Sequence, residues 1–189
     1  MRVLLRAGAD PTRRCARGLT AAQHASELGT PPPELVELLK PRVVVGVGAF
    51  AEDRLREALE RGVVQYVVLG AGYDTFAYRQ PPGTSHLRVV EVDQPATQAA
   101  KLASLRDAAI AIPSNVTHAA IDFEHTSLRE GLAQHGVAID APTFFSWLGV
   151  TMYLTREVVA DTLGTLAAFP SGSEVVFTLQ RCARRGSAR

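Results

Sequence analysis

One segment constrains the fold more than any other part of the sequence: an apolar run that ends in a glycine turn. Tyr66 to Leu69 are four consecutive apolar or aromatic residues, and they lead directly into Gly70-Ala71-Gly72. An unbroken apolar run is typical of a parallel strand, because helices cover both faces of its sheet. Glycine lets the backbone turn tightly and lets a ligand approach it closely, and open α/β sheets bind ligands outside the carboxyl ends of their strands. The segment therefore predicts an α/β sheet with a ligand site at this turn.

Strands and helices are expected to alternate from residue 41 onward. We predict strands over 66–70, 86–92, 118–122, 143–150 and 173–179, and helices over 51–61, 95–105, 127–135 and 155–169. This alternation indicates βαβ units with right-handed crossovers, and hence a parallel, Rossmann-like sheet with flanking helices.

Residues 1–40 differ in character from the rest of the chain. They contain LLRAGADP, then GLTAAQHASELG, a proline-rich break, and ELVELL. In that order they resemble the end of one ankyrin repeat followed by the two helices of the next. About three stacked repeats are needed to bury the apolar face of each one, so a single unit would have to be a remnant, a cap or the end of a longer array. A protein partner bound through this segment and a purely packing role are both open.

The composition argues against several classes of protein. The 189 residues carry a formal net charge of +1, which gives no electrostatic footprint for nucleic acid. No apolar run approaches the roughly 20 residues of a membrane span, and the N-terminus lacks a signal-peptide core. Cys15 and Cys182 are solitary and far apart, so they indicate neither a disulfide framework nor a metal cluster. We expect a cytoplasmic protein without a metal site that binds neither nucleic acid nor membranes.

Acidic residues at the ends of two predicted strands extend the candidate site. Glu91 and Asp93 end the second strand, about 20 residues after the glycines, where nucleoside-binding domains place an acid that accepts both hydrogens of a ribose diol. Asp93 could instead only cap the helix that begins at Pro95. Asp122, which Phe123 follows, could meet an adenine amino group while the ring packs on the base, or it could be a turn residue.

Four segments occur in an order that resembles one known family: VVLGAGYDTFAYR, VVEVDQPATQAAK, AAIDFE and FFSWLGVTMYLT. Over roughly residues 49–180 the chain resembles the leucine carboxyl methyltransferase-like family of S-adenosylmethionine-dependent O-methyltransferases. The resemblance implies a class I methyltransferase fold, S-adenosylmethionine as the cofactor, and a small-molecule or carboxylate substrate. It also implies contacts with the methionine part of the cofactor (Gly70, Ala71, Gly72 and Asp74), with its ribose (Glu91 or Asp93), with its adenine (Asp122 and Phe123) and with the pocket wall (Leu148 and Gly149). Such enzymes work largely by positioning and desolvation, so no catalytic side chain is predicted.

The chain departs from the family pattern in three places. The family carries arginines in an ARTRFAED-like run, and one of them anchors the cofactor carboxylate, whereas this chain has Val47 and Ala49 at those places. We expect the family's N-terminal helices to be missing and the sheet to be incomplete after its fifth strand. The methyltransferase domain, residues 41–189, would then be incomplete behind an ankyrin-like segment.

Two alternative functions stay open. The first is a non-catalytic interaction protein, made of an ankyrin-like cap on a degenerate methyltransferase domain. The second starts from VVVGVGAFAED, whose Gly-x-Gly-x-x-Ala spacing after an apolar triplet matches a dinucleotide fingerprint and would favour an NAD-type oxidoreductase.

Overall fold

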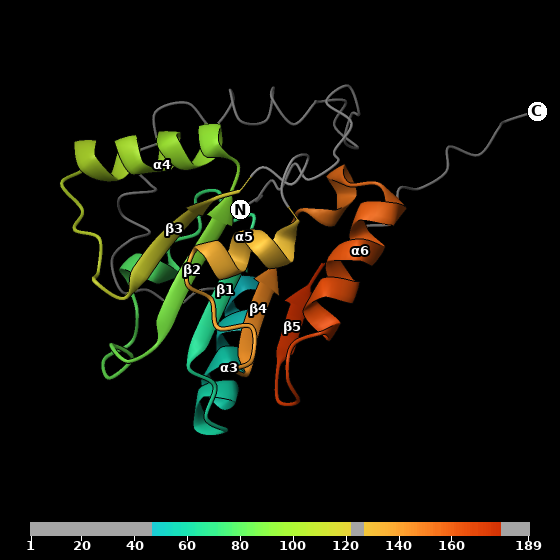
Figure 1. The fold of residues 1–189 in the computed structure, drawn as a ribbon. Helices are drawn as coiled ribbons and strands as arrows, with labels where there is room; N and C mark the ends of the chain where they lie inside the picture. The colour runs from blue at the N-terminus through green and yellow to red at the C-terminus, as the bar shows by residue number, and fades with distance from the viewer. Residues whose placement is uncertain (1–46, 122–126, 179–189) are drawn as a thin grey trace, which may run out of the picture.

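The computed structural model describes residues 47–121 and 127–178. Within these ranges, strands and helices alternate along the chain as predicted (Figure 1). The ankyrin-like unit, the apolar triplet of the NAD hypothesis, Asp122 and Phe123 all lie outside the described residues.

Parallel strands form one sheet in the order β3-β2-β1-β4-β5. The strands are β1 (Gln65–Leu69), β2 (Arg88–Asp93), β3 (Val116–Ala120), β4 (Thr143–Trp147) and β5 (Glu174–Phe177). This is the Rossmann-like order, which confirms the predicted fold class. The strand order reverses between β1 and β4, and ligands of such sheets bind in the crevice at this switch point.

Helices cover both faces of the sheet. They are α3 (Val47–Glu60), α4 (Pro95–Asp107), α5 (Leu128–Gln134) and α6 (Arg156–Ala167). The side chains of α5 and α6 pack on the face that carries Leu69 and Trp147, in front of the sheet in Figure 1. The side chains of α3 pack on the opposite face, against Tyr66 and Phe144. Every residue of β1 and β4 is buried, as expected for strands covered on both sides.

Three helices begin at residue types that favour a helix N-terminus. Pro95 lies in the first turn of α4, where its missing N–H costs no hydrogen bond. The hydroxyl of Ser127 caps α5 by accepting the N–H of Glu130, and that of Thr155 caps α6 by accepting the N–H of Val158. These bonds satisfy N–H groups that have no partner within the helix.

Some boundaries differ from the prediction. β4 ends at Trp147 rather than Val150, because the chain then turns into a short 3-10 helix, η2 (Thr151–Tyr153). A second 3-10 helix that the sequence pattern did not predict, η1 (Phe76–Tyr78), follows the glycine turn. No helix in the described ranges is long and apolar enough to cross a membrane.

Candidate cofactor-binding site

The turn after β1 contains two glycines in the left-handed backbone region. The φ angle is +68° at Gly70 and +43° at Gly72, a conformation that residues with a Cβ adopt only at a cost. The N–H groups of Gly70 and Ala71 both donate to the carbonyl of Val92 on β2, at 2.8 and 3.0 Å. The turn is thereby joined to the end of the neighbouring strand, at the switch point of the sheet.

Asp93 connects this turn to the start of α4. Its Oδ2 accepts the N–H of Gly72 at 2.6 Å, and its Oδ1 accepts the N–H of Gln94 at 2.7 Å. Gln94, rather than Asp93, is the N-cap residue of α4, and its side chain makes no capping bond. Each oxygen of a carboxylate can accept more than one hydrogen bond, so Asp93 keeps acceptor capacity for hydroxyl groups of a ligand.

Burial raises the pKa of Asp93. The residue is 1% exposed, and this burial raises the pKa of its carboxyl group to about 7, although the N–H groups of Gly72 and Gln94 act to lower it. A ligand that donates hydrogen bonds to this carboxyl group favours its ionised form.

Asp74 shapes the end of the turn. Its N–H donates to the carbonyl of Ala71 at 2.6 Å, and its Oδ1 accepts the N–H of Phe76 at 2.8 Å. Burial raises the pKa of the Asp74 carboxyl group. One oxygen of this predicted site residue is therefore already engaged in starting η1.

An ion pair holds α3 against the segment that follows the turn. Both terminal nitrogens of Arg79 donate to the carboxylate of Glu52, and Arg79 Nε donates to Thr75 Oγ1 at 2.9 Å. Glu52 belongs to the VGVGAFAED run, in which Val47 and Ala49 depart from the family pattern. The structure thus places the run that lacks the family's arginines next to the turn segment.

Glu91 lies in a different environment from Asp93. Because side chains alternate along a strand, Val89, Glu91 and Asp93 point to the same face of β2. The Oε2 atom of Glu91 lies 2.7 Å from Lys101 Nζ and accepts the hydroxyl of Tyr78 at 2.9 Å. Protein groups therefore engage the Oε2 atom of Glu91, and Asp93 is the acid whose carboxylate contacts the turn.

The charge of Glu91 is compensated inside the fold. The residue is 0% exposed, and His118 Nε2 lies 3.4 Å from its Oε2. Burial acts to raise the pKa of Glu91, but Lys101 and His118 outweigh that effect and hold the pKa below its usual value. Glu91 is therefore ionised at neutral pH.

The sequence patterns did not single out Lys101, Tyr78 or His118 as site residues. A signal for Lys101 was present, because it lies at helical spacing between Gln98 and Leu105, and these three are the buried residues of α4. A lysine on the buried face of a helix needs an anionic partner. No comparable pattern marks Tyr78 and His118.

The remaining predicted residues follow β4 and β3. Leu148 and Gly149 come directly after β4, which pairs in parallel with β1. They therefore lie at the carboxyl ends of the strands, on the same side of the sheet as the turn. Both are half-buried, and the N–H of Gly149 donates to Thr178 Oγ1 at 2.6 Å. Asp122 and Phe123, which follow β3 in the chain, lie outside the described residues.

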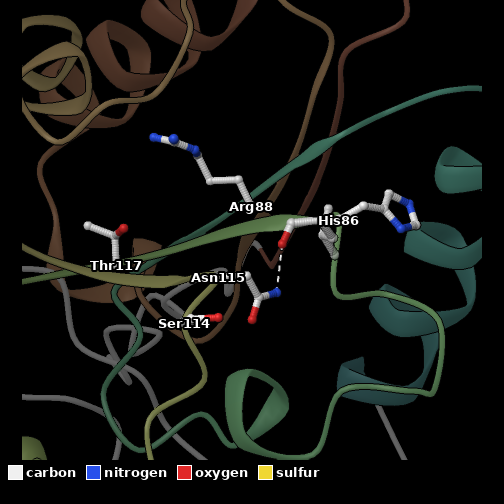
Figure 2. A pocket seen from close by; sticks show the side chains of 6 residues that line it. His86, Arg88, Ser114, Asn115 and Thr117 are labelled. Atoms are coloured by element: carbon white, nitrogen blue, oxygen red, sulfur yellow. Dashed lines mark hydrogen bonds between the residues drawn. The ribbon is translucent and has the colours of Figure 1, made fainter.

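A polar hollow of about 220 Å³ lies at the other end of the strands, where β2 and β3 begin (Figure 2). Figure 2 shows the side chains of Arg88 and His86 extending in opposite directions. The side-chain amide nitrogen of Asn115 donates a hydrogen bond to the carbonyl of Leu87 at 2.7 Å. Because these polar groups do not converge, the candidate site remains at the carboxyl ends of the strands.

The strand order, the glycine turn and the acid at the end of β2 define a Rossmann-like α/β domain of the nucleotide-binding kind. The sequence model of the family described as leucine carboxyl methyltransferase matches residues 4–167, and the chain belongs to this family. The match begins well before residue 49, where the resemblance read from the motifs begins. It gives no support to an ankyrin-like unit in residues 1–40, which stays a prediction.

Curated relatives agree with this assignment. "Putative S-adenosyl-L-methionine-dependent methyltransferase YktD" of Bacillus subtilis (strain 168) is 42% identical over 130 residues, which are 68% of this chain and 42% of the relative. The similarly named SCO7813 of Streptomyces coelicolor is 36% identical over 134 residues, 69% of this chain and 46% of the relative. A third, from Mycolicibacterium paratuberculosis, is 32% identical over 158 residues, 76% of this chain and 28% of the relative. The chain spans less than half the length of each, and family membership favours a methyltransferase over the NAD hypothesis.

Proposed function

We propose that this chain binds S-adenosylmethionine at the carboxyl ends of β1, β2 and β4, and that it methylates an oxygen atom of a small-molecule or carboxylate substrate. The observation that carries the proposal is Asp93, whose carboxylate joins a turn with two left-handed glycines to the start of α4. The family match and the names of the relatives support the choice of cofactor.

The described residues fit this cofactor. The turn at Gly70, Ala71 and Gly72 offers a backbone without bulky side chains for the methionine part. Asp93 has spare acceptor capacity for the two ribose hydroxyls. Glu91 acts indirectly in this proposal, because Lys101, Tyr78 and His118 surround its Oε2 atom and the residue is 0% exposed. Contacts of Asp74 with the methionine part, of Leu148 and Gly149 with the pocket wall, and of Asp122 and Phe123 with adenine complete the proposed site.

When bound, S-adenosylmethionine supplies an electrophilic methyl group attached to a sulfonium. The contribution of the protein is then to hold the cofactor, to orient the acceptor oxygen in line and to keep water out. These functions need no catalytic acid or base, which is consistent with a site whose acids are proposed only to hold the cofactor.

Isothermal titration of the 189-residue chain with S-adenosylmethionine tests the cofactor assignment, with NAD as the control ligand. We expect sub-millimolar binding of the first and none of the second. Undetectable binding of S-adenosylmethionine would favour the non-catalytic alternative, and binding of NAD alone would favour the oxidoreductase. Formation of S-adenosylhomocysteine, followed by mass spectrometry with small carboxylic acids and alcohols as acceptors, tests the O-methylation.

A protein partner for residues 1–40 also stays a prediction, since these residues lie outside the described part of the chain. Deleting them and measuring cofactor affinity would show whether they serve the methyltransferase domain instead.

A further inference from the structure

Lys101 is a buried cation between β2 and the proposed cofactor turn. It lies on α4 and is only 4% exposed. Its Nζ atom is 2.7 Å from Glu91 Oε2, and it donates to the backbone carbonyl of Asp74 at 2.8 Å. Asp74 is the second residue after Gly72, so one ammonium group links the helix, the strand and the turn.

Neighbouring groups hold this ammonium group in place. Nζ lies 5.2 Å from the centre of the Tyr78 ring, close enough for a cation–π interaction. The hydroxyl of Tyr78 lies 2.7 Å from His118 Nε2 and also donates to the carboxylate that pairs with Lys101. Tyr78 of η1 and Glu91 of β2 thus restrict where the ammonium group can lie, and His118 of β3 contacts both of them.

Stability alone is a poor explanation for a charged pair at this place. The cost of removing two charges from water can exceed their attraction, and an apolar pair of similar volume is often at least as stable. Oε1 of Glu91 and Oε1 of Gln98 are buried without a hydrogen-bond partner, so the network is also incompletely satisfied. The hydrogen bond from Lys101 to the turn explains the presence of the Lys101–Glu91 pair better than stability does.

We propose that Lys101 is a positioning residue for the cofactor turn, and this inference rests on the proposed function. Its ammonium group, neutralised by Glu91, holds the carbonyl of Asp74 and thereby fixes the far end of the turn, whose first three residues are bonded to Val92 and Asp93. Without this donor, the Asp74 carbonyl loses its charge-assisted hydrogen bond and the turn is free to shift. The cofactor then has to bear the cost of ordering the turn when it binds.

The test compares Glu91→Gln with the double variant Glu91→Gln/Lys101→Met in the 189-residue chain. Both variants lack the buried ion pair, and only the double variant lacks the donor to Asp74. At a temperature where circular dichroism shows both to be folded, we expect amide hydrogen exchange in residues 70–76 to be about tenfold faster in the double variant. We expect its affinity for S-adenosylmethionine to be about tenfold weaker as well.

Arg106→Met is the matched control, because it removes a positive charge from the exposed side of the same helix. Exchange and affinity should stay within about twofold of the unmodified chain. If the double variant does not fold, Lys101→Arg tests the positioning role instead, since arginine keeps a cation for Glu91 and a donor for the Asp74 carbonyl. A folded Lys101→Arg protein should keep a protected turn and most of its affinity, and loss of both would contradict the proposal.

Equal exchange and equal affinity in the two Glu91 variants would overturn the inference. A uniform rise in exchange over the whole sheet would also overturn it, because that result marks a purely structural role. If the unmodified chain binds no S-adenosylmethionine while exchange still differs at the turn, the proposed function fails and the ordering of the turn by Lys101 stands.

Discussion

Gly72 and Asp93 are 21 positions apart in the chain, yet the N–H of the first donates to the carboxylate of the second at 2.6 Å. The bond runs from the turn after β1 to the end of β2. The side chain proposed for the ribose therefore also shapes the turn proposed for the methionine part. Two parts of the site depend on one carboxylate.

Replacing Asp93 by asparagine should weaken cofactor binding. An amide has one acceptor oxygen, and its nitrogen cannot accept the N–H of Gly72 or Gln94. We expect Asp93→Asn to lower the affinity for S-adenosylmethionine by about ten- to a hundredfold, measured by isothermal titration. Asp107→Asn, at an exposed position at the end of α4, should change this affinity by less than about twofold. Equal affinities in the two variants would contradict the role of Asp93.

The raised pKa of Asp93 predicts a pH dependence of stability with a definite sign. Burial raises this pKa from 3.8 to about 7, so between these values the folded state holds a proton that the unfolded state has lost. The contribution of Asp93 to stability therefore falls as the pH rises through this window, by at most about 1.4 kcal/mol per unit. Urea denaturation at several pH values should show the original protein losing stability relative to Asp93→Asn. If the stability of the original protein relative to Asp93→Asn stays constant or rises with pH, the pKa of Asp93 is not raised.

The ion pair of Arg79 and Glu52 should contribute measurably to stability. Its side chains are 11% and 21% exposed, so Arg79→Met leaves a partly buried carboxylate without its partner. We expect a loss of about 1–3 kcal/mol in the free energy of unfolding, measured with urea. Arg56→Met breaks a pair with Asp53 in which both side chains are more than half exposed, and it should cost less than about 0.5 kcal/mol. Similar losses in both variants would argue against a special role for the Arg79 pair.

Two helical glycines should respond to alanine in opposite directions. A Cβ at Gly131 on α5 would lie 2.8 Å from Ile121 Cδ1 and 2.9 Å from its Cγ2, whereas a Cβ at Gly164 on α6 would meet nothing within 4 Å. Gly131→Ala should therefore destabilise the protein by about 1–2 kcal/mol, and Gly164→Ala should stabilise it by about 0.5–1 kcal/mol. Thermal unfolding of both variants checks this, and Ile121→Val should relieve part of the first effect. A stabilised Gly131→Ala protein would show that Ile121 yields freely.

The sequence was a good guide to the order of elements and a weaker one to individual contacts. Apolar runs such as Tyr66 to Leu69 identify buried strands, because burial on both faces leaves no alternation to misread. The pattern could not decide between Glu91 and Asp93, since residues two apart in a strand share a face. That choice depends on Lys101, which reaches Glu91 from a different element. The 3-10 helix at Phe76 to Tyr78 is too short for a periodic signal.

The central place of β1 has a consequence for how this chain folds as it is synthesised. Gln65–Leu69 leaves the ribosome long before Thr143–Trp147, its partner on one side. Until β4 emerges, β1 pairs with β2 alone and keeps an open edge, which is a template for incorrect pairing. Closing that edge requires a contact between distant parts of the chain, and such contacts form slowly. The crevice at the switch point is therefore among the last parts of the described sheet to be completed.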